Sequence, residues 1–374
     1  MNEPEPLQQL ERTYVRLQNR KLSYFSGCDY FRLSSHPSVL AAAAAGIKKY
    51  GLNVAASRMT TGNHVLYRQL ERSLADFFGA EDALLVSSGY MTNLVVAQAM
   101  AGNVSHALLD KGSHPSLADA AQLLDCPMLE FDSRNPDQLA SAVRRCGPGA
   151  NLALLTDGMF SRDGSAAPLA AYRKVLPRDA VIIVDDAHGT GVLGRTGKGA
   201  LEHAGVDRGR IIQTITLSKA FGAYGGAILS TARLRQRILD RSRLFVGSTP
   251  LPLPLANAAL TSIKILTKDK SLRRRLFQNA GYVKTALRQA GLTMPETPGP
   301  ILALRPTGDR EAEQLKRKLL AAGIYPPFIR YPGGPASGYY RFVISSEHTR
   351  SQLDSLVRVL ISAPAFFGPA SAPH

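Results

Sequence analysis

Residues 214–226 read TITLSKAFGAYGG and place a single lysine, Lys219, between an apolar run and a cluster of glycines. The run at 211–217 favours a strand, and a second apolar run follows at 227–229. A lysine held among apolar groups has a lowered pKa, and its neutral amine can form a Schiff base with an aldehyde. The neighbouring glycines allow backbone and ligand to approach closely. Read alone, the stretch fits a surface lysine at a strand end better, so its meaning depends on the rest of the chain.

Four largely apolar runs precede this stretch, and each is followed by a turn with polar residues. They cover residues 83–86, 107–110, 151–156 and 181–184. Strands that are apolar on both faces are typical of a buried parallel sheet with helices between successive strands. We therefore expect an α/β fold with a mainly parallel central sheet flanked by helices. Polar groups collect at the carboxyl ends of these runs, where open α/β sheets bind their ligands.

The segments on either side of this region are expected to form separate parts of the fold. Residues 7–22 carry Leu10, Tyr14 and Leu17 at helical spacing, which predicts an amphipathic helix. The C-terminal part predicts a smaller α+β domain, and residues 366–374 are expected to be loose. Its expected strands are 301–304, 324–325 and 340–344. The predicted division is an N-terminal helix and arm over 1–45, a large α/β domain over 46–255 and a small α+β domain over 256–374.

The chain is strongly basic, with 45 lysines and arginines against 29 acidic residues and a formal net charge of +16. Such a charge suggests anionic partners such as nucleic acid, acidic proteins or phosphorylated ligands. The basic residues are scattered, however, and no aromatic residues are interleaved with them as in a nucleic-acid stacking surface. We therefore expect no nucleic-acid partner and interpret the arginines as solvated helix faces. One predicted helix carries Arg233, Arg235, Arg237, Arg241 and Arg243.

The cysteines and the first residues of the chain indicate the compartment. Cys28, Cys126 and Cys146 are widely spaced and match no CxxC pair and no metal-ligand spacing. We therefore expect a reducing cytoplasm and no metal site. The first residues are acidic and contain proline, unlike a signal peptide. No apolar run in the sequence is long enough to cross a bilayer.

Two glycine-containing turns are candidates for binding a phosphate. The stretch 191–199, GVLGRTGKG, resembles a phosphate loop, but its spacing is wrong and Gly199 stands where a serine or threonine is required. The turn 87–90, SSGY, lies between a predicted strand and a predicted helix. Free backbone N–H groups and the positive end of the helix dipole meet at such a turn and favour an anion. This turn is therefore a candidate anion site, although many α/β turns share the pattern.

Four strand ends together offer a coherent set of side chains. Lys219 and the turn at 87–90 are joined by His114 after one strand. Asp185 and His188 follow another. Pyridoxal phosphate needs such a set: a lysine for its aldehyde, a carboxylate that keeps the pyridine nitrogen protonated, phosphate donors and a flat partner for the ring. The plainer alternative is that the aspartates at 185 and 186 cap a helix and that the histidine after the strand is a cap or loop residue.

With these residues in view, the sequence resembles the α-oxoamine synthases, which are fold-type I pyridoxal phosphate enzymes. The resemblance covers nearly the whole chain, from about residue 24 to residue 360. It is strongest at 184–192 (VDDAHGTGV), 216–222 (TLSKAFG) and 156–164 (TDGMFSRDG). The family includes 8-amino-7-oxononanoate synthase, 2-amino-3-ketobutyrate CoA ligase, 5-aminolevulinate synthase and serine palmitoyltransferase. The resemblance implies pyridoxal 5'-phosphate as the cofactor.

The resemblance also implies a role for each matching residue. Lys219 would bind the cofactor's aldehyde and move the Cα proton, Asp185 would pair with the pyridinium nitrogen, and His114 would stack on the ring. His188 would hydrogen-bond the phenolic oxygen, as would Ser161. The phosphate would be held by Gly89, Tyr90, Thr216, Ser218 and, from the neighbouring subunit, Thr249. Because such sites lie at a dimer interface in the family, a homodimer is implied.

The implied reaction is a decarboxylative condensation of a small amino acid with acyl-CoA or an acyl carrier protein. It gives an α-amino ketone, CO₂ and a free thiol. Arg341, in the run YRFVI at 340–344, matches the arginine that takes the substrate carboxylate, a role that suits a planar bidentate donor. An ordinary strand arginine is the alternative. Synthesis of 8-amino-7-oxononanoate from alanine is the first choice, and the glycine-using ligase and the serine palmitoyltransferase are alternatives.

Some segments depart from the family pattern. Residues 53–56, NVAA, replace a glycine-rich run, and Tyr67 replaces a histidine. Because these segments lie near the substrate mouth in the family, glycine, alanine and serine all stay open as the amino acid. Asp157, where oxononanoate synthases often carry glutamate, leans toward the ligase. Two hypotheses of other kinds also stay open: an aminotransferase, and a non-catalytic descendant that binds a partner through its basic surface.

Overall fold

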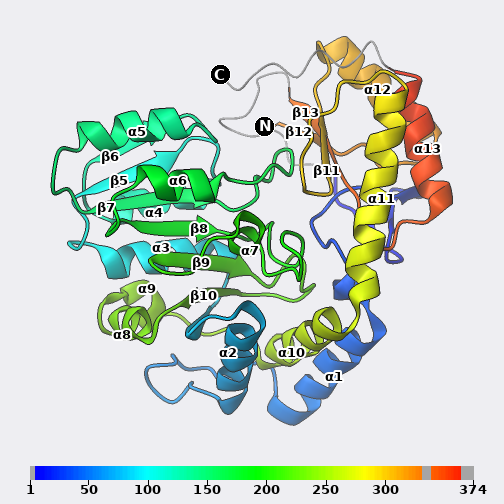
Figure 1. The fold of residues 1–374 in the computed structure, drawn as a ribbon. Coiled ribbons are helices and arrows are strands. Elements are labelled where there is room, and N and C mark those ends of the chain that lie inside the picture. The colour runs from blue at the N-terminus through cyan, green and yellow to red at the C-terminus, as the bar shows by residue number, and fades with distance from the viewer. Residues whose placement is uncertain (1–4, 331–337, 364–374) are drawn as a thin grey trace. The chain divides into compact units, whose positions relative to one another are not determined.

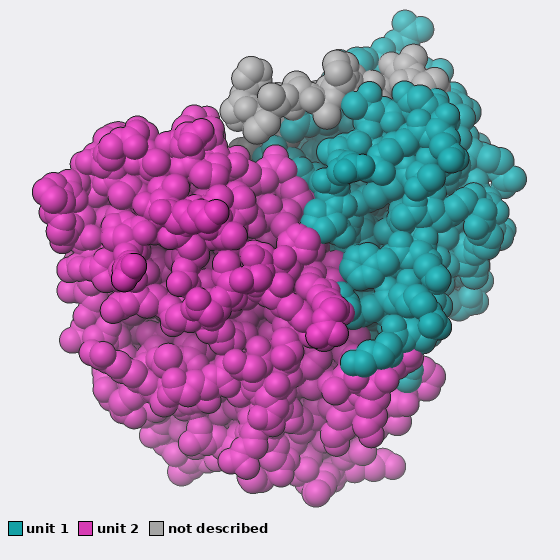
Figure 2. All heavy atoms as spheres, viewed as in Figure 1, with its two compact units in different colours: residues 1–36, 162–164, 270–372 teal, residues 37–161, 165–269, 373–374 magenta. Residues whose placement is uncertain are grey.

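The computed structural model of the chain describes residues 5–330 and 338–363, so the tail at 366–374 lies outside the described residues. The chain divides into two compact units (Figure 2). Unit 2 comprises residues 37–161 and 165–269. Unit 1 comprises the described residues before 37, those at 162–164 and those after 269. The domain boundaries after residues 45 and 255 stay a prediction from the sequence.

The centre of unit 2 is a seven-stranded sheet with the order β4-β10-β9-β8-β7-β5-β6 (Figure 1). Its strands are β4 (Asp82–Val86), β5 (His106–Asp110), β6 (Met128–Phe131), β7 (Leu152–Asp157), β8 (Val181–Asp185), β9 (Ile211–Thr216) and β10 (Gly226–Ser230). The strands from β6 to β9 pair in parallel. Only β10 runs antiparallel to both of its neighbours, β9 and β4. The predicted mainly parallel α/β sheet is therefore confirmed.

Helices cover this sheet because its strands are apolar on both faces. The helices of unit 2 are α1 (Pro37–Tyr50), α2 (Val65–Phe78), α3 (Gly89–Met100), α4 (Pro115–Leu123), α5 (Pro136–Arg145), α6 (Leu169–Val175), α7 (Ala200–Ala204), α8 (Ala232–Arg241), α9 (Arg243–Val246) and α10 (Leu253–Lys268). Apolar side chains of α3, α4 and α8 form one core cluster with those of the strands. Every residue of β7 and β9 is buried, as expected for central strands.

A buried carboxylate joins three elements of unit 2. Glu71 of α2 accepts from Arg58 at 2.5 Å, from Arg235 of α8 at 3.0 Å and from the backbone N–H of Leu85 in β4 at 3.0 Å. Burial alone would raise the pKa of Glu71, but these donors outweigh it and the pKa is lowered. Arg235 is thus an ion-pair partner in the interior, and its interpretation as part of a solvated helix face was wrong.

The N-terminal segment of unit 1 is a small antiparallel sheet, so the amphipathic helix predicted for residues 7–22 was wrong. Its strands are β1 (Gln8–Gln9), β2 (Tyr14–Leu17) and β3 (Arg20–Ser23). Val15 and Leu22 are cross-strand partners, and both are buried. Arg16, the next residue after Val15 in β2, points to the other face and is exposed. Gln18 turns the chain with a φ of 52°. Burial of every second side chain against the rest of the unit therefore decides the structure here, and it outweighs the helical spacing of the apolar residues.

The second sheet of unit 1 is antiparallel, with the order β11-β13-β12. Its strands are β11 (Ile301–Leu304), β12 (Phe328–Ile329) and β13 (Tyr339–Val343), and the remaining elements are η1 (Leu33–Ser35), α11 (Lys270–Gln289), α12 (Asp309–Ala321) and α13 (Arg350–Ile361). The strand predicted at 324–325 was wrong: Ile324 makes a single bridge to Ser23. The prolines at 326 and 327 lack the N–H that a longer ladder requires. No described helix combines the length and apolar composition that crossing a membrane requires.

His348 is a buried titratable group of unit 1. Its Nδ1 accepts from the backbone N–H of Ser345 at 2.9 Å, so its Nε2 carries the proton toward the carbonyl of Tyr24 at 3.0 Å. The ring stacks on Phe25 with centroids 4.2 Å apart. Burial, followed by the positive charge of Arg32, lowers the pKa of His348 to about 3. The folded unit therefore holds this imidazole in its neutral form.

We expect the chain to lose stability as the pH falls from 6.5 toward 3, because the unfolded chain then takes up a proton that folded His348 refuses. Two pH units below the unfolded pKa this loss of stability amounts to about 3 kcal/mol. Urea unfolding in neutral and in mildly acidic buffer should show a smaller loss in His348→Gln than in the wild type. The exposed His203→Gln is the matched control. Equal losses in the wild type and in His348→Gln would contradict the expectation.

Candidate active site

A cavity of about 230 Å³ lies in unit 2 at the carboxyl ends of the parallel strands. Its lining residues are Gly89, Tyr90, His114, Ser116, Asp157, Asp185, Ala187, His188, Thr216, Ser218 and Lys219. Segments that are far apart in the sequence thus supply one site, as expected where parallel strands end at a common edge. Most of the residues predicted from the sequence are brought together here.

Lys219 lies in a loop that folds back on the end of β9. The backbone N–H of Leu217 donates to Gly225 at 2.9 Å, and that of Ala223 donates to Leu217 at 2.9 Å. Gly225 has a φ of 107°, which side-chain-bearing residues rarely adopt. A further bond from the N–H of Gly222 to the carbonyl of Lys219, at 2.9 Å, closes the turn. The glycines of this stretch therefore fix the backbone that carries Lys219 at the cavity.

Asp185 ends β8, and both oxygens of its carboxylate accept hydrogen bonds. Oδ2 accepts from the side-chain amide of Asn93 at 2.7 Å, and Oδ1 accepts from the backbone N–H of Ala187 at 3.1 Å. The amide oxygen of Asn93 accepts from the hydroxyl of Thr214 at 2.7 Å. This second bond orients the amide so that its N–H₂ group faces the carboxylate. Asn93 and Thr214 are fully buried, so the carboxylate is held by rigid interior groups.

His114 is the N-cap of α4 and lines the cavity. Its Nδ1 accepts from the backbone N–H of Ser116 at 3.2 Å, so the proton of the neutral ring sits on Nε2. Burial lowers the pKa of His114, against the opposing negative charge of Asp185. The plainer alternative of a capping histidine is therefore correct, but the same residue also presents a neutral imidazole to the cavity.

Asp157 places a second carboxyl group beside Asp185. It ends β7, and the two residues are cross-strand partners. Its Oδ1 accepts from the backbone N–H of His114 at 3.0 Å. Burial, followed by the negative charge of Asp185, raises the pKa of Asp157 well above its usual range. Two like charges this close disfavour double ionisation of the pair.

Asp186 follows Asp185 directly but has a different environment. Its Oδ2 accepts from the backbone N–H of Ala200, at the start of α7, at 2.8 Å and from the amide of Gln213 at 2.6 Å. Burial raises the pKa of Asp186 to about 7. Of the two aspartates, Asp186 is therefore the one that caps a helix, and Asp185 is the one that lines the cavity.

The start of α3 forms an end of the cavity that suits an anion. A Cβ at Gly89 would lie 2.7 Å from the Cβ of Thr216, so glycine is required there. The first N–H groups of a helix have no acceptor within the helix and form the positive end of its dipole. Tyr90 lines the cavity, but its hydroxyl is already engaged, since it donates to Asp119. Backbone N–H groups, with the hydroxyl of Ser218, are thus the donors available for a phosphate.

Some predicted residues are placed less directly. Ser161 follows β7 and Thr249 lies in an exposed segment after α9, and neither lines the cavity. Thr216 lines it, but its hydroxyl donates to the carbonyl of Gly225 at 3.2 Å. Arg341 lies on β13 of unit 1. The roles of these residues stay predictions.

The sequence analysis missed the residues that connect the site. Asn93 donates to Ser116 at 2.9 Å as well as to Asp185, and the hydroxyl of Ser116 lies 2.8 Å from Nδ1 of His114. One amide thereby links the carboxylate to the imidazole. The available signal was an asparagine in a mostly apolar helix, because a buried amide requires partners. The sequence does not say which partners these are.

This donor set fits pyridoxal phosphate. An amine, a carboxylate on a buried amide, a neutral imidazole and a helix N-terminus converge on one cavity. Among the described residues, no group of three or more His, Cys, Asp or Glu side chains is arranged to hold a metal ion.

Comparisons of sequence agree with this chemistry. The family model described as aminotransferase class I and II matches residues 25–360. The 8-amino-7-oxononanoate synthase of Thioalkalivibrio sulfidiphilus (strain HL-EbGR7) is 35% identical over 344 residues, which cover 91% of this chain and 88% of the relative. The 8-amino-7-oxononanoate synthase 1 of Bacillus subtilis (strain 168) is 30% identical over 357 residues, which cover 95% and 91%.

Comparisons of structure agree as well. A serine palmitoyltransferase from S. paucimobilis, solved with bound PLP, has a TM-score of 0.91 and 26% identity over 97% of this chain and 93% of that one. The 8-amino-7-oxononanoate synthase of Francisella tularensis has a TM-score of 0.78 and 27% identity over 90% and 96%. The chain therefore belongs to the class I and II aminotransferase family and, within it, to the α-oxoamine synthases.

Proposed function

We propose that the chain catalyses the decarboxylative condensation of alanine with a seven-carbon dicarboxylic acyl thioester, which gives 8-amino-7-oxononanoate, CO₂ and a free thiol. The observation that carries this proposal is 30–35% identity, over at least 91% of the chain, to enzymes named 8-amino-7-oxononanoate synthase. The likeness to serine palmitoyltransferase, at 26–28% identity, supports the reaction class and keeps serine as the alternative amino acid.

The cofactor of the proposed reaction is pyridoxal 5'-phosphate. Lys219 would hold it covalently through its aldehyde, Asp185 would hold the pyridine nitrogen, and His188 would hydrogen-bond the phenolic oxygen. The phosphate would be bound by the start of α3 and by Ser218. Bound in this way, the cofactor supplies an electron sink for charge that develops on the amino acid's Cα.

The chain's own residues position the reactants and move protons. The amine of Lys219 would be free to act as a base once the amino group of the substrate takes its place, and it would then take the Cα proton. Cα then bonds to the thioester carbonyl carbon as the bond to the thiolate breaks. After CO₂ has left, the ammonium of Lys219 would return the proton to Cα. Asp185, fixed by Asn93, would keep a proton on the pyridine nitrogen. Neutral His114 would give the ring a flat partner without adding charge. The guanidinium of Arg341 binds the substrate carboxylate until it departs as CO₂.

A homodimer and a cytoplasmic location belong to the same proposal. Thr249 is exposed, which leaves it available to the phosphate of a neighbouring subunit's site. Cys28, Cys126 and Cys146 are free thiols, which agrees with a reducing compartment. The thioester is carried either by coenzyme A or by an acyl carrier protein.

The first test combines spectroscopy with a thiol-release assay. The wild type with added pyridoxal phosphate should be yellow and should release thiol when alanine and the acyl thioester are both present. Lys219→Ala should lose the visible band and the activity, because no amine remains to hold the aldehyde. Glycine and serine are assayed in parallel. Faster thiol release with serine would overturn the choice of alanine, and a ketone-dependent exchange of amino groups without thiol release would favour an aminotransferase.

A second prediction concerns Asn93 as a positioning residue. In Asn93→Ala the Asp185 carboxylate loses a charge-assisted hydrogen bond, which corresponds to a loss of roughly 10-fold or more in cofactor affinity and kcat. Asn103→Ala, whose amide donates to the backbone carbonyls of Met100 and Ala101, is the matched control. Cofactor dissociation constants, measured together with the melting temperature of the cofactor-free protein, separate positioning from loss of fold. Unchanged cofactor affinity in Asn93→Ala would refute the role.

A third prediction concerns Arg341. Arg341→Ala should raise the KM for the amino acid by roughly 10- to 100-fold, since a bidentate pair with the substrate carboxylate is lost. The KM for the acyl thioester should change little. Arg305→Ala, an exposed arginine of the same unit, is the control. Steady-state kinetics with each substrate varied in turn gives both constants, and an unchanged amino-acid KM would rule out this assignment.

A further inference from the structure

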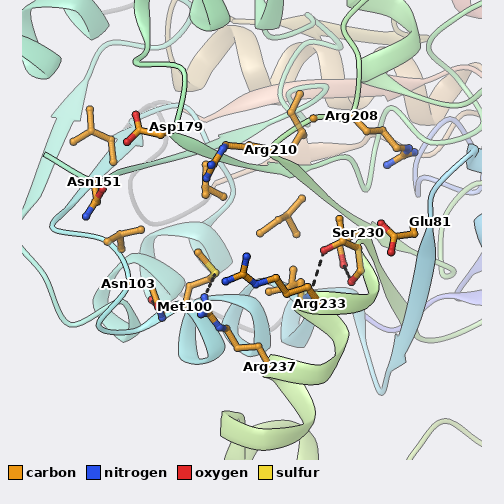
Figure 3. Close-up of a pocket in the computed structure, with 18 of the residues that line it drawn as sticks. Glu81, Met100, Asn103, Asn151, Asp179, Arg208, Arg210, Ser230, Arg233 and Arg237 are labelled. Atoms are coloured by element: carbon orange, nitrogen blue, oxygen red, sulfur yellow. Dashed lines mark hydrogen bonds between the residues drawn. The ribbon is translucent and has the colours of Figure 1, made fainter. Parts of the chain in front are cut away.

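A second cavity of unit 2, of about 760 Å³, lies at the edge of the sheet opposite the candidate active site (Figure 3). It is bordered by the amino ends of β7, β8 and β9 and by the carboxyl end of β10. Because β8 and β9 have 5 and 6 residues, the two edges are about 17–20 Å apart. Sites for small molecules typically have volumes of about 300–1,000 Å³. The cavity is therefore large enough for a ligand and is separate from the catalytic one.

Positive charge dominates the lining of this cavity. Its charged residues are Arg208, Arg210, Arg233, Arg237, Glu81 and Asp179. Figure 3 shows Arg233 and Arg237 reaching from helix α8 toward the side of the cavity where Arg210 lies. One of the two carboxylates is already engaged, since Glu81 accepts from the backbone N–H of Ala232 at 3.2 Å. The excess of guanidinium groups favours an anion.

These guanidinium groups lack carboxylate partners in the described part of the chain. Arg210 and Arg233 make no hydrogen bond or ion pair there, and Arg237 contacts only the Sδ of Met100, at 3.8 Å. Arg208 is partly engaged, since its Nη2 donates to the carbonyl of Phe78 at 3.0 Å and to the side chain of Gln213 at 2.7 Å, whereas its buried Nη1 finds no acceptor among the described residues. Like charges that share a cavity repel one another, so an anion bound between them relieves an unfavourable arrangement.

A neighbouring arginine shows the contrast. Arg235 lies on the same helix, α8, and is paired with Glu71 at 3.0 Å and with Asp82 at 3.1 Å. The carboxylates that Arg235 can reach, on Glu71 and Asp82, thus join helix α8 to α2 and to strand β4. The arginines on the cavity side of α8 are left to face a space that a ligand can enter.

The remaining lining suits the non-ionic part of a ligand. Met100, Val104, Ile212 and Leu234 supply apolar surface. The side-chain amide of Asn151 also lines the cavity and makes no hydrogen bond within the described part of the chain. An asparagine amide offers a donor and an acceptor side by side, which matches the hydrogen-bonding edge of adenine. Apolar surface, a free amide and several guanidinium groups together suit a nucleotide.

We propose that this cavity binds the adenosine phosphate part of a nucleotide. The phosphates lie among Arg210, Arg233 and Arg237, which match phosphate oxygens in bidentate geometry. The base lies on the apolar surface with its edge toward Asn151. A free nucleotide and coenzyme A both carry this chemistry. The proposal does not depend on the proposed reaction, because the site lies at the other edge of the sheet.

The test is calorimetric titration of the holoenzyme, freed of excess pyridoxal phosphate, with ADP, coenzyme A and inorganic phosphate separately. ADP should bind with one site per chain. The double variant Arg210→Ala with Arg233→Ala should raise the dissociation constant for ADP by roughly 10- to 100-fold, since charge-assisted hydrogen bonds to phosphate are lost. Arg241→Ala, at the end of the same helix and outside the cavity, should bind ADP as the wild type does. The condensation activity of the double variant should be unchanged.

The outcomes separate the sources of the nucleotide. Arginine-dependent binding of ADP alone supports a free nucleotide, and arginine-dependent binding of both ADP and coenzyme A supports the adenosine phosphate part that they share. Absence of ADP binding overturns the proposal, as does ADP binding that the double variant retains. Inorganic phosphate that binds as tightly as ADP would also overturn it, because the base would then contribute nothing.

Discussion

The candidate active site depends on a carboxylate that is held at the end of a strand by a buried amide. Asp185 is 8% exposed, and a charge in such a place is tolerated only where donors replace water. Asn93 of α3 is one of those donors, and Thr214 of β9 fixes it in turn. The same amide reaches Ser116 at the start of α4. The carboxylate is therefore positioned by a sheet and two helices, so its geometry does not rest on a flexible loop.

The neighbouring Asp186 explains the glycine-rich segment around the site. A Cβ added at Gly158, Gly189 or Gly199 would collide with the carboxylate of Asp186. The stretch 191–199, which resembles a phosphate loop in sequence, thus ends beside a buried carboxylate that accepts from Ala200 and not beside a phosphate. The two consecutive aspartates therefore have different roles. Asp185 lines the cavity, and Asp186 anchors the loop that follows β8.

Much of the fold follows from the sequence because it rests on local pattern. The apolar runs of the central sheet and the residue types at their ends were sufficient to predict which strand ends carry the site. The prediction failed where partners distant in the chain decide the outcome. Residues 7–22 fit a helix by spacing, yet Val15 and Leu22 are buried as a strand pair. An asparagine such as Asn93 in a buried helix requires hydrogen-bond partners, but the sequence does not identify them. In the structure these partners lie on β8, β9 and α4.

The reversal of one strand explains why so much positive charge lies away from the cofactor site. Helices that follow parallel strands begin at the carboxyl edge of the sheet, and α3 begins beside the candidate active-site cavity in this way. Because β10 runs antiparallel to β9, the helix that follows it begins at the opposite edge. Arg233 and Arg237 of α8 are thereby placed with Arg208 and Arg210, which precede β9 at that same edge. From sequence alone, Arg233 and Arg237 are interpreted as part of a solvated helix face, whereas the topology of the sheet gathers them around one cavity. The same topology leaves the candidate active-site cavity with one lysine, Lys219, among its lining side chains, and its amine is the lining group that can form a Schiff base with an aldehyde.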